Sequence, residues 1–213
     1  MNELKIKICG MRDPGNIREI GKLFPDYMGF IYYPQSKRYA GELSASDISD
    51  LPETIQKTGV FVNTPPQESL TLCRKMNLDT VQLHGTESPD VCKLMRHSGL
   101  KVIKAFNIGM DTDFSGMRDY LESCDFFLLD TAGGGYGGTG LKFDWMRLKE
   151  YEFEKPFFLS GGIGPTDADS ILELSHPELY GVDLNSRFEK EPGVKNRSTL
   201  EGFIERIRGK REF

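Results

Sequence analysis

The sequence lacks the residue patterns that mark several classes of protein. Its 213 residues contain four cysteines, Cys9, Cys73, Cys92 and Cys124, and no two of them form a Cys-X-X-Cys pair. A chain of this length needs no disulfide framework, so we expect four reduced thiols. Nor do His, Cys and Asp residues cluster at the spacing of metal ligands, and we expect no metal site.

Positive charge and long apolar runs are also scarce. The chain carries 27 Lys and Arg against 32 Asp and Glu, a net charge of −5, and no basic stripe that would suit a nucleic-acid partner. It has no apolar run of about 18 residues that could span a membrane. Residues 1–5 lack the apolar core of a signal peptide. These features predict a cytoplasmic protein without membrane or nucleic-acid partners.

What the chain does have is a regular alternation of short apolar runs and helix-like stretches. The apolar runs cover residues 4–9, 27–31, 57–62, 80–83, 102–105, 126–130, 156–160 and 181–184. Strand–helix alternation implies parallel strands, because parallel neighbours need a crossover connection. Eight units predict a single α/β domain over residues 1–213, a (β/α)8 TIM barrel with outer helices. An open doubly wound sheet is the alternative.

Reactive and polar residues stand where the predicted strands end, and active sites of such barrels lie at that face. Cys9 ends the first strand, although an isolated cysteine is more often a small buried hydrophobe. Asp130 ends the apolar sixth strand, where desolvation would raise the pKa of a carboxyl group and make it a general acid. The alternative for Asp130 is a cap on the following loop.

Glycines and polar residues after the seventh and eighth strands predict a phosphate site. Many barrels bind phosphate there through backbone N–H groups. The predicted contacts, with tight structural turns as the alternative, are Gly161, Gly162, Asn185, Ser186 and Arg187.

Three further features lie at the same face. Arg38 follows the second strand and could pair with a substrate carboxylate, or simply be solvated. His84 ends the fourth strand as a substrate contact or a core histidine. Residues 133–140 include six glycines, which indicates a lid over the site or a flexible surface loop.

Several segments together make the chain resemble the phosphoribosylanthranilate isomerase family of tryptophan biosynthesis. The matching segments are in family order: residues 7–11, 59–63, 81–85, 129–131, 137–140, 143–145, 160–163, 181–183, 189 and 192–195. Each is weakly specific alone, but their order over nearly the whole chain is highly specific. One departure is Ser186-Arg187-Phe188, where the family usually has Ser-Gly-Val.

The resemblance implies an Amadori rearrangement of N-(5-phosphoribosyl)anthranilate without a cofactor. It implies Asp130 as the acid that opens the ribose ring and Cys9 as the base that removes the C2′ proton. Arg38 would hold the anthranilate carboxylate, and Asp183 would support the base. We expect Lys7 and nearby backbone N–H groups to lower the pKa of Cys9.

Three other functions compete with this interpretation. The histidine-pathway sugar-phosphate isomerase uses a carboxylate where Cys9 stands and has a second glycine-rich phosphate motif, which this chain lacks. Indole-glycerol-phosphate synthase depends on strand-end Lys and Glu residues that we do not find. A non-catalytic barrel that only binds phosphate ligands is the third. Charge and fold favour a monomer.

Overall fold

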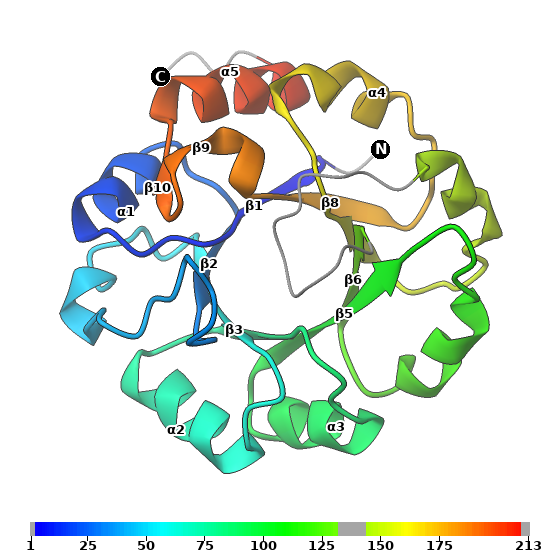
Figure 1. The fold of residues 1–213 in the computed structure, drawn as a ribbon, viewed down its shortest axis with the longest axis horizontal. Helices are drawn as coiled ribbons and strands as arrows, with labels where there is room; N and C mark the ends of the chain where they lie inside the picture. Colours follow the sequence, from blue (N-terminus) through cyan, green and yellow to red (C-terminus); the bar gives the residue numbers. More distant parts are fainter. Residues whose placement is uncertain (1–2, 132–143, 210–213) are drawn as a thin grey trace.

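The computed structural model describes residues 3–131 and 144–209, and these form a closed barrel of eight parallel strands (Figure 1). Each strand pairs with the next, and β1 closes the ring by pairing with β8. The strands are β1 Lys5–Ile8, β2 Tyr27–Ile31, β3 Gln56–Phe61, β4 Thr80–Leu83, β5 Lys101–Ile108, β6 Phe126–Thr131, β7 Phe157–Leu159 and β8 Leu179–Leu184. The predicted TIM barrel is confirmed, with all eight predicted strands in place.

The crossover segments form the outer ring seen in Figure 1. The α-helices are α1 Pro14–Gly21, α2 Pro66–Lys75, α3 Pro89–His97, α4 Ala168–Leu172 and α5 Arg197–Arg208. Shorter 3₁₀ segments are η1 Ala45–Asp47, η2 Phe114–Tyr120, η3 Trp145–Glu150, η4 Pro165–Asp167 and η5 Ser186–Phe188. Helix starts follow the local sequence: Asp13 and Ser88 cap α1 and α3, and a proline opens each of these helices.

One strand is longer than its sequence pattern suggests. The apolar run covers residues 102–105, whereas β5 continues to Ile108. Its extra residues pair with β6, including Asn107 with Asp130. The strand therefore continues because its neighbour offers hydrogen-bond partners, which a polarity pattern does not record.

Apolar side chains fill two regions. The larger lies between the strands and the outer helices, and the smaller lies inside the barrel around Tyr27, Ile103 and Phe158. Tyr27 and Tyr180 join their hydroxyl groups at 3.2 Å within this inner cluster. Apolar residues thus fill the inside of the barrel near the starts of the strands, and the polar groups collect at the strand ends.

The four cysteines agree with the expectation of reduced thiols. Cys9, Cys73, Cys92 and Cys124 are all free and buried. Cys73 and Cys92 lie on α2 and α3, and Cys124 lies in the turn before β6.

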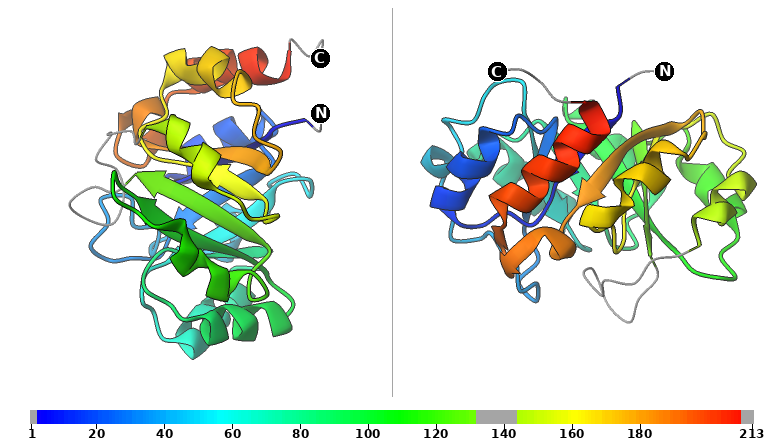
Figure 2. Two further views of the ribbon diagram at one scale, coloured as in Figure 1. Left: turned by 90° about the vertical axis from the view of Figure 1, so that its right-hand side faces the viewer. Right: turned by 90° about the horizontal axis from the view of Figure 1, so that it is seen from above.

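A two-stranded hairpin extends the loop between β8 and α5. Its strands are β9 Glu189–Glu191 and β10 Val194–Lys195, paired antiparallel. Figure 2 shows this hairpin at the end of the barrel toward which the strand arrows point. Within residues 3–131 and 144–209, no helix has the length and apolar character needed to cross a membrane.

Candidate active site

Cys9 lies directly after β1, at the mouth of the barrel, and only 3% of it is exposed. Gly29 on β2 makes room for the thiol, since a Cβ there would lie 2.8 Å from Sγ. Gly10 has a φ of +79°, and a Cβ on it would lie 2.6 Å from Cδ of Arg38 and 2.8 Å from Oδ1 of Asn185. The Cys9–Gly10 turn therefore brings segments distant in sequence together around the thiol.

Two buried charges flank Cys9. The ammonium of Lys7 on β1 donates to Oδ1 of Asp183 on β8 at 2.8 Å, and both side chains are buried. Burial alone would lower the pKa of Lys7, but Asp183 and Cys9 more than offset this and raise it. Lys7 is therefore a permanent cation beside the thiol.

The expectation of a lowered pKa for Cys9 is wrong. Burial raises the pKa of the Cys9 thiol, and the positive charge of Lys7 only partly opposes this. Asp183 adds to the increase, and Lys195 from the hairpin opposes it. The sequence showed the cation next to the cysteine, but not how completely the thiol is removed from water.

Asp130 is placed at the end of β6, as predicted, and is 9% exposed. Its Oδ1 accepts from the backbone N–H of Thr131 at 2.9 Å, so the loop-capping alternative is partly realised. Its Oδ2 lies 3.3 Å from Nε2 of His84. The amide nitrogen of Gln82 lies 2.6 Å from Nδ1, the other ring nitrogen of His84.

Asp183 lies between the pair Lys7–Cys9 and the pair Asp130–His84. It binds Lys7 next to Cys9, and it interacts electrostatically with both Asp130 and His84. The structure thus brings the predicted acid, base, His84 and Asp183 into one group of side chains inside the mouth of the barrel.

The predicted phosphate residues lie in two neighbouring loops. Gly161 and Gly162 both have left-handed backbone, with φ of +87° and +65°. A Cβ on Gly161 would lie 2.2 Å from Oγ1 of Thr131, so no other residue fits without a shift of β6. Ser186 and Arg187 form η5, and the exposed side chain of Arg187 passes beside Gly164.

Two charged residues of the hairpin, Glu189 and Lys195, belong to the site although the motifs gave them no role. The carboxylate of Glu189 accepts from Nε and Nη2 of Arg38 at 2.8 Å and 2.7 Å. Lys195 donates to Glu189 and to Oδ1 of Asn185, both at 2.7 Å. Their matching family positions were the only signal, since Glu189-Lys190-Glu191 reads as a solvated turn.

Two further predictions concern the glycine-rich loop and metal ligands. Residues 133–140, predicted as a lid or a surface loop, lie outside the described residues. Among residues 3–131 and 144–209, no group of three or more His, Cys, Asp or Glu side chains is arranged to hold a metal ion.

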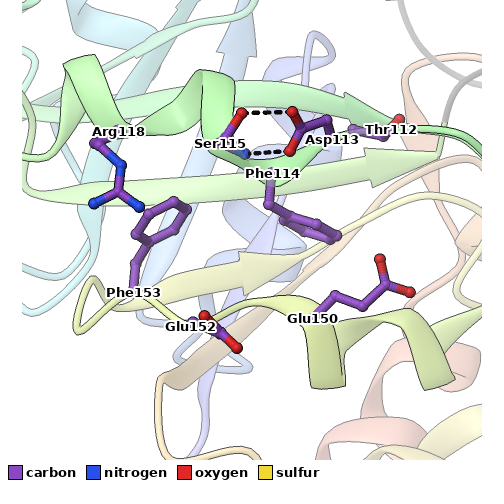
Figure 3. Close-up of a pocket in the computed structure, with 8 residues that line it drawn as sticks. All are labelled: Thr112, Asp113, Phe114, Ser115, Arg118, Glu150, Glu152 and Phe153. Carbon is purple, nitrogen blue, oxygen red and sulfur yellow. Dashed lines mark hydrogen bonds between the residues drawn. The ribbon is translucent and has the colours of Figure 1, made fainter.

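A separate hollow of about 300 Å³ lies on the outer ring, between η2 and η3 (Figure 3). It is lined by Thr112, Asp113, Phe114, Ser115, Arg118, Glu150, Glu152 and Phe153. None of these is a predicted site residue. Some of its polar groups are engaged: Asp113 accepts from Ser115, and Arg118 stacks over Phe153.

A parallel barrel with a buried thiol, a carboxylate and a histidine at its strand ends defines an acid–base enzyme of the TIM-barrel class. Comparison with known proteins gives the family. The family described as N-(5'phosphoribosyl)anthranilate (PRA) isomerase matches residues 6–206. The chain belongs to this family.

Individual relatives agree with this assignment. The N-(5'-phosphoribosyl)anthranilate isomerase of Parabacteroides distasonis is 45% identical, over 95% of this chain and 92% of that protein. A solved isomerase in complex with reduced 1-(o-carboxyphenylamino)-1-deoxyribulose 5-phosphate is 31% identical, with a TM-score of 0.81, over 97% of this chain and 99% of the other. A structure of monomers generated from the dimeric Thermotoga maritima isomerase is 30% identical, with a TM-score of 0.80, over 97% and 99%.

Proposed function

We propose that this protein is an N-(5'-phosphoribosyl)anthranilate isomerase, which converts its substrate to 1-(2-carboxyphenylamino)-1-deoxyribulose 5-phosphate in tryptophan biosynthesis. The observation that carries the proposal is the grouping of Cys9, Asp130 and His84 at the mouth of a barrel that belongs to this family. The family match favours this reaction over the histidine-pathway rearrangement and over a non-catalytic barrel.

Asp130 is the general acid in this proposal. It protonates the furanose ring oxygen, the C1′–O bond breaks, and an iminium forms between C1′ and the anthranilate nitrogen. His84 contacts the substrate beside the acid, because its Nε2 lies 3.3 Å from the Asp130 carboxylate. The Thr131 N–H engages Oδ1, so the proton that is transferred belongs on Oδ2, the oxygen beside His84.

Cys9 is the base. Its thiolate removes the C2′ proton, the electron pair forms a C1′–C2′ double bond, and the iminium becomes a neutral enolamine. Tautomerisation then gives the ketone. The atoms and electrons of the substrate are only rearranged, so the reaction needs no cofactor. Asp183 supports the base by accepting a 2.8 Å hydrogen bond from Lys7, which holds the Lys7 ammonium next to Cys9.

The ends of the substrate are bound on either side of these groups. Gly161, Gly162, Asn185, Ser186 and Arg187 bind the phosphate, for which left-handed glycines supply close backbone approach. Arg187 stands where the family usually has glycine, and its place beside Gly164 supports a direct charge contact. Arg38 binds the carboxylate of the anthranilate ring.

The experiment that tests this function supplies anthranilate, phosphoribosyl pyrophosphate and the transferase that couples them. The decay of substrate fluorescence is then followed with and without this protein. No acceleration would refute the proposal. Asp130→Asn should abolish turnover, and Cys9→Ser should slow it by orders of magnitude with the circular dichroism spectrum unchanged. A fully active Cys9→Ser would remove the thiol from the mechanism.

We also propose that the whole chain acts as one catalytic domain, as a monomer in the cytoplasm. In the described part of the chain, the exposed large hydrophobic side chains are spread over separate segments: Phe24, Tyr39, Leu94, Met110, Met146 and Leu172. Single exposed apolar side chains are normal on a monomer and do not by themselves mark an interface. Light scattering after size exclusion tests this, and a mass twice 24.1 kDa would contradict it.

A further inference from the structure

Three charged side chains from two distant parts of the chain form one cluster beside Cys9. They are Arg38, from the loop after β2, and Glu189 and Lys195, from the β9–β10 hairpin. Their side chains are 13%, 5% and 0% exposed. Removing three charges from water is costly, and the clustered pairs offset only part of that cost. Since hydrophobic residues would be less costly at these positions, we infer that the cluster has a function.

Within residues 3–131 and 144–209, part of the Arg38 guanidinium has no hydrogen-bond partner. A guanidinium carries five N–H donors in a planar fork. Glu189 accepts from the side of this fork, at Nε and Nη2. The end formed by Nη1 and the second Nη2 proton points away from Glu189, and a second carboxylate can bind there end-on. The stem of Arg38 passes over Gly10, the residue after Cys9, so Arg38 lies beside the turn that holds the thiol.

The charge count explains the third member. Arg38 and Glu189 alone are neutral, and a neutral pair attracts a substrate carboxylate only weakly. Lys195 binds the same carboxylate at 2.7 Å and brings the cluster to one net positive charge. The hydrogen bonds from Arg38 and the charge of Lys195 outweigh burial and hold the pKa of Glu189 below its ordinary value.

We propose that Glu189 and Lys195 are positioning residues for Arg38, which fix its guanidinium and give the site the single positive charge that matches the carboxylate of an aryl amine substrate. This rests on the role of Arg38 proposed above. Lys195 also opposes the increase in the pKa of Cys9, so the test of this role measures ligand affinity and not turnover.

The hairpin is built to hold Lys195 in place. Asn16 on α1 accepts from the backbone N–H of Lys195 at 2.7 Å and donates to its carbonyl at 3.0 Å. The pairing of β10 with β9 is irregular between Val194 and Lys195. Gly193 has a φ of +90° and donates its N–H to Glu189 at 3.1 Å. Both hairpin charges are therefore fixed by backbone contacts.

The charge of the cluster should change near neutral pH. Burial lowers the pKa of Lys195 to about 8, although Glu189 and Cys9 oppose this and Arg38 adds to it. The neutral side chain of Asn185 also accepts a hydrogen bond from the Lys195 ammonium group. Below this pKa the cluster carries its net charge, and above it the charge is lost. Affinity for the ring carboxylate should therefore fall as pH rises through 8.

The test compares two ligands by titration calorimetry. One is reduced 1-(o-carboxyphenylamino)-1-deoxyribulose 5-phosphate, and the other is the same compound without the ring carboxylate. The affinity ratio is the Kd of the ligand without the carboxylate divided by the Kd of the ligand that carries it, so it measures the contribution of the carboxylate. Binding of either ligand does not depend on the chemistry of Cys9. For Lys195→Met the carboxylate-bearing ligand should bind at least about tenfold more weakly, with the other ligand little changed.

A charge-balanced double variant supplies the control. In the double variant Lys195→Met with Glu189→Gln, the cluster again has one net positive charge, on Arg38. This variant should recover much of the affinity ratio that Lys195→Met loses, and the ratio should no longer depend on pH. A purely structural role of Lys195 predicts no recovery. In the unaltered protein, the ratio should decrease between about pH 7 and about pH 9.

The outcomes separate this inference from the proposed function. If Arg38→Met leaves the affinity ratio unchanged, the proposed role of Arg38 itself is wrong. If Arg38→Met lowers the affinity ratio but Lys195→Met weakens the binding of both ligands equally, only the positioning role is overturned. Should Lys195→Met not fold, a pH-independent ratio in the unaltered protein overturns it instead.

Discussion

Cys9, the proposed base, lies in surroundings that work against its ionisation. Burial raises the pKa of its thiol, and Asp183 raises it further, while Lys7 and Lys195 oppose them. The reactive thiolate is therefore a minor species at neutral pH. A thiolate of high pKa is also a stronger base. The site therefore has a smaller fraction of thiolate, but each thiolate has a higher affinity for the proton.

This balance predicts how the rate depends on pH. Since the pKa of Cys9 is raised, the thiolate fraction and kcat should still be rising above pH 9, the ordinary value of a thiol. Lys7→Met removes the largest opposing charge, so kcat should fall by about tenfold or more at neutral pH and the rising limb should move to higher pH. Stopped-flow turnover across the pH range measures both.

Lys7→Met also leaves Asp183 as a buried, unpaired carboxylate. The control is Lys7→Met with Asp183→Asn, which removes both charges. Because Asp183 raises the pKa of Cys9, the limb of the double variant should lie at lower pH than that of Lys7→Met alone. An identical limb in both variants would contradict the assigned causes.

Among the elements, the β9–β10 hairpin contributes charged groups to the site, although it is not part of the barrel. It carries Glu189 and Lys195, and its docking on α1 depends on Asn16. Asn16 replaces a strand neighbour by bonding both backbone groups of Lys195. A side chain thereby completes the hydrogen bonds of a two-residue strand.

Replacing Asn16 should loosen this element without unfolding the barrel. Asn16→Ala leaves a buried N–H and C=O of Lys195 without partners, which should lower the free energy of unfolding by about 2 kcal/mol. KM should rise, with kcat little changed. Glu19→Gln is the control, since its 3.4 Å contact with Asn16 is marginal. Denaturant titration and initial rates check both; an unchanged KM in Asn16→Ala would separate the hairpin from substrate binding.

At the scale of the whole molecule, the barrel carries a buried ion pair that takes no part in the proposed chemistry. Lys104 on β5 donates to Glu87 at 3.0 Å and to the carbonyl of Gly85 at 2.7 Å. Glu87 in turn accepts from the backbone N–H of Asn63 and of Gly85. The pair ties the loops after β3 and β4 to β5.

Breaking this pair should destabilise the protein and spare its chemistry. Lys104→Met leaves Glu87 buried and uncompensated, so the free energy of unfolding should fall by about 3–5 kcal/mol. Lys93→Met breaks an exposed pair with Asp90 at 3.8 Å and should have no measurable effect. Guanidinium titration of both variants tests this; equal stabilities would show that the buried pair is dispensable.

The order of amino acids is enough to define the barrel and to identify its strand-end residues. Strand and helix patterns are local, and eight βα units close in essentially one way. Residues at strand ends then meet at one face of the barrel. For this reason Cys9, Asp130, His84 and Asp183 can be selected as candidate site residues from the sequence, and the structure brings them together.

The electrostatics of the site, in contrast, arise only in the folded chain. Arg38 and Glu189 are 151 residues apart in sequence, and Lys7 and Asp183 are 176 apart. The burial of a side chain, and the charges it then meets, depend on such distant segments. That is why the sequence predicts the pKa of Cys9 in the wrong direction, and why Glu189 and Lys195 resemble solvated residues of a turn until the hairpin docks beside Arg38.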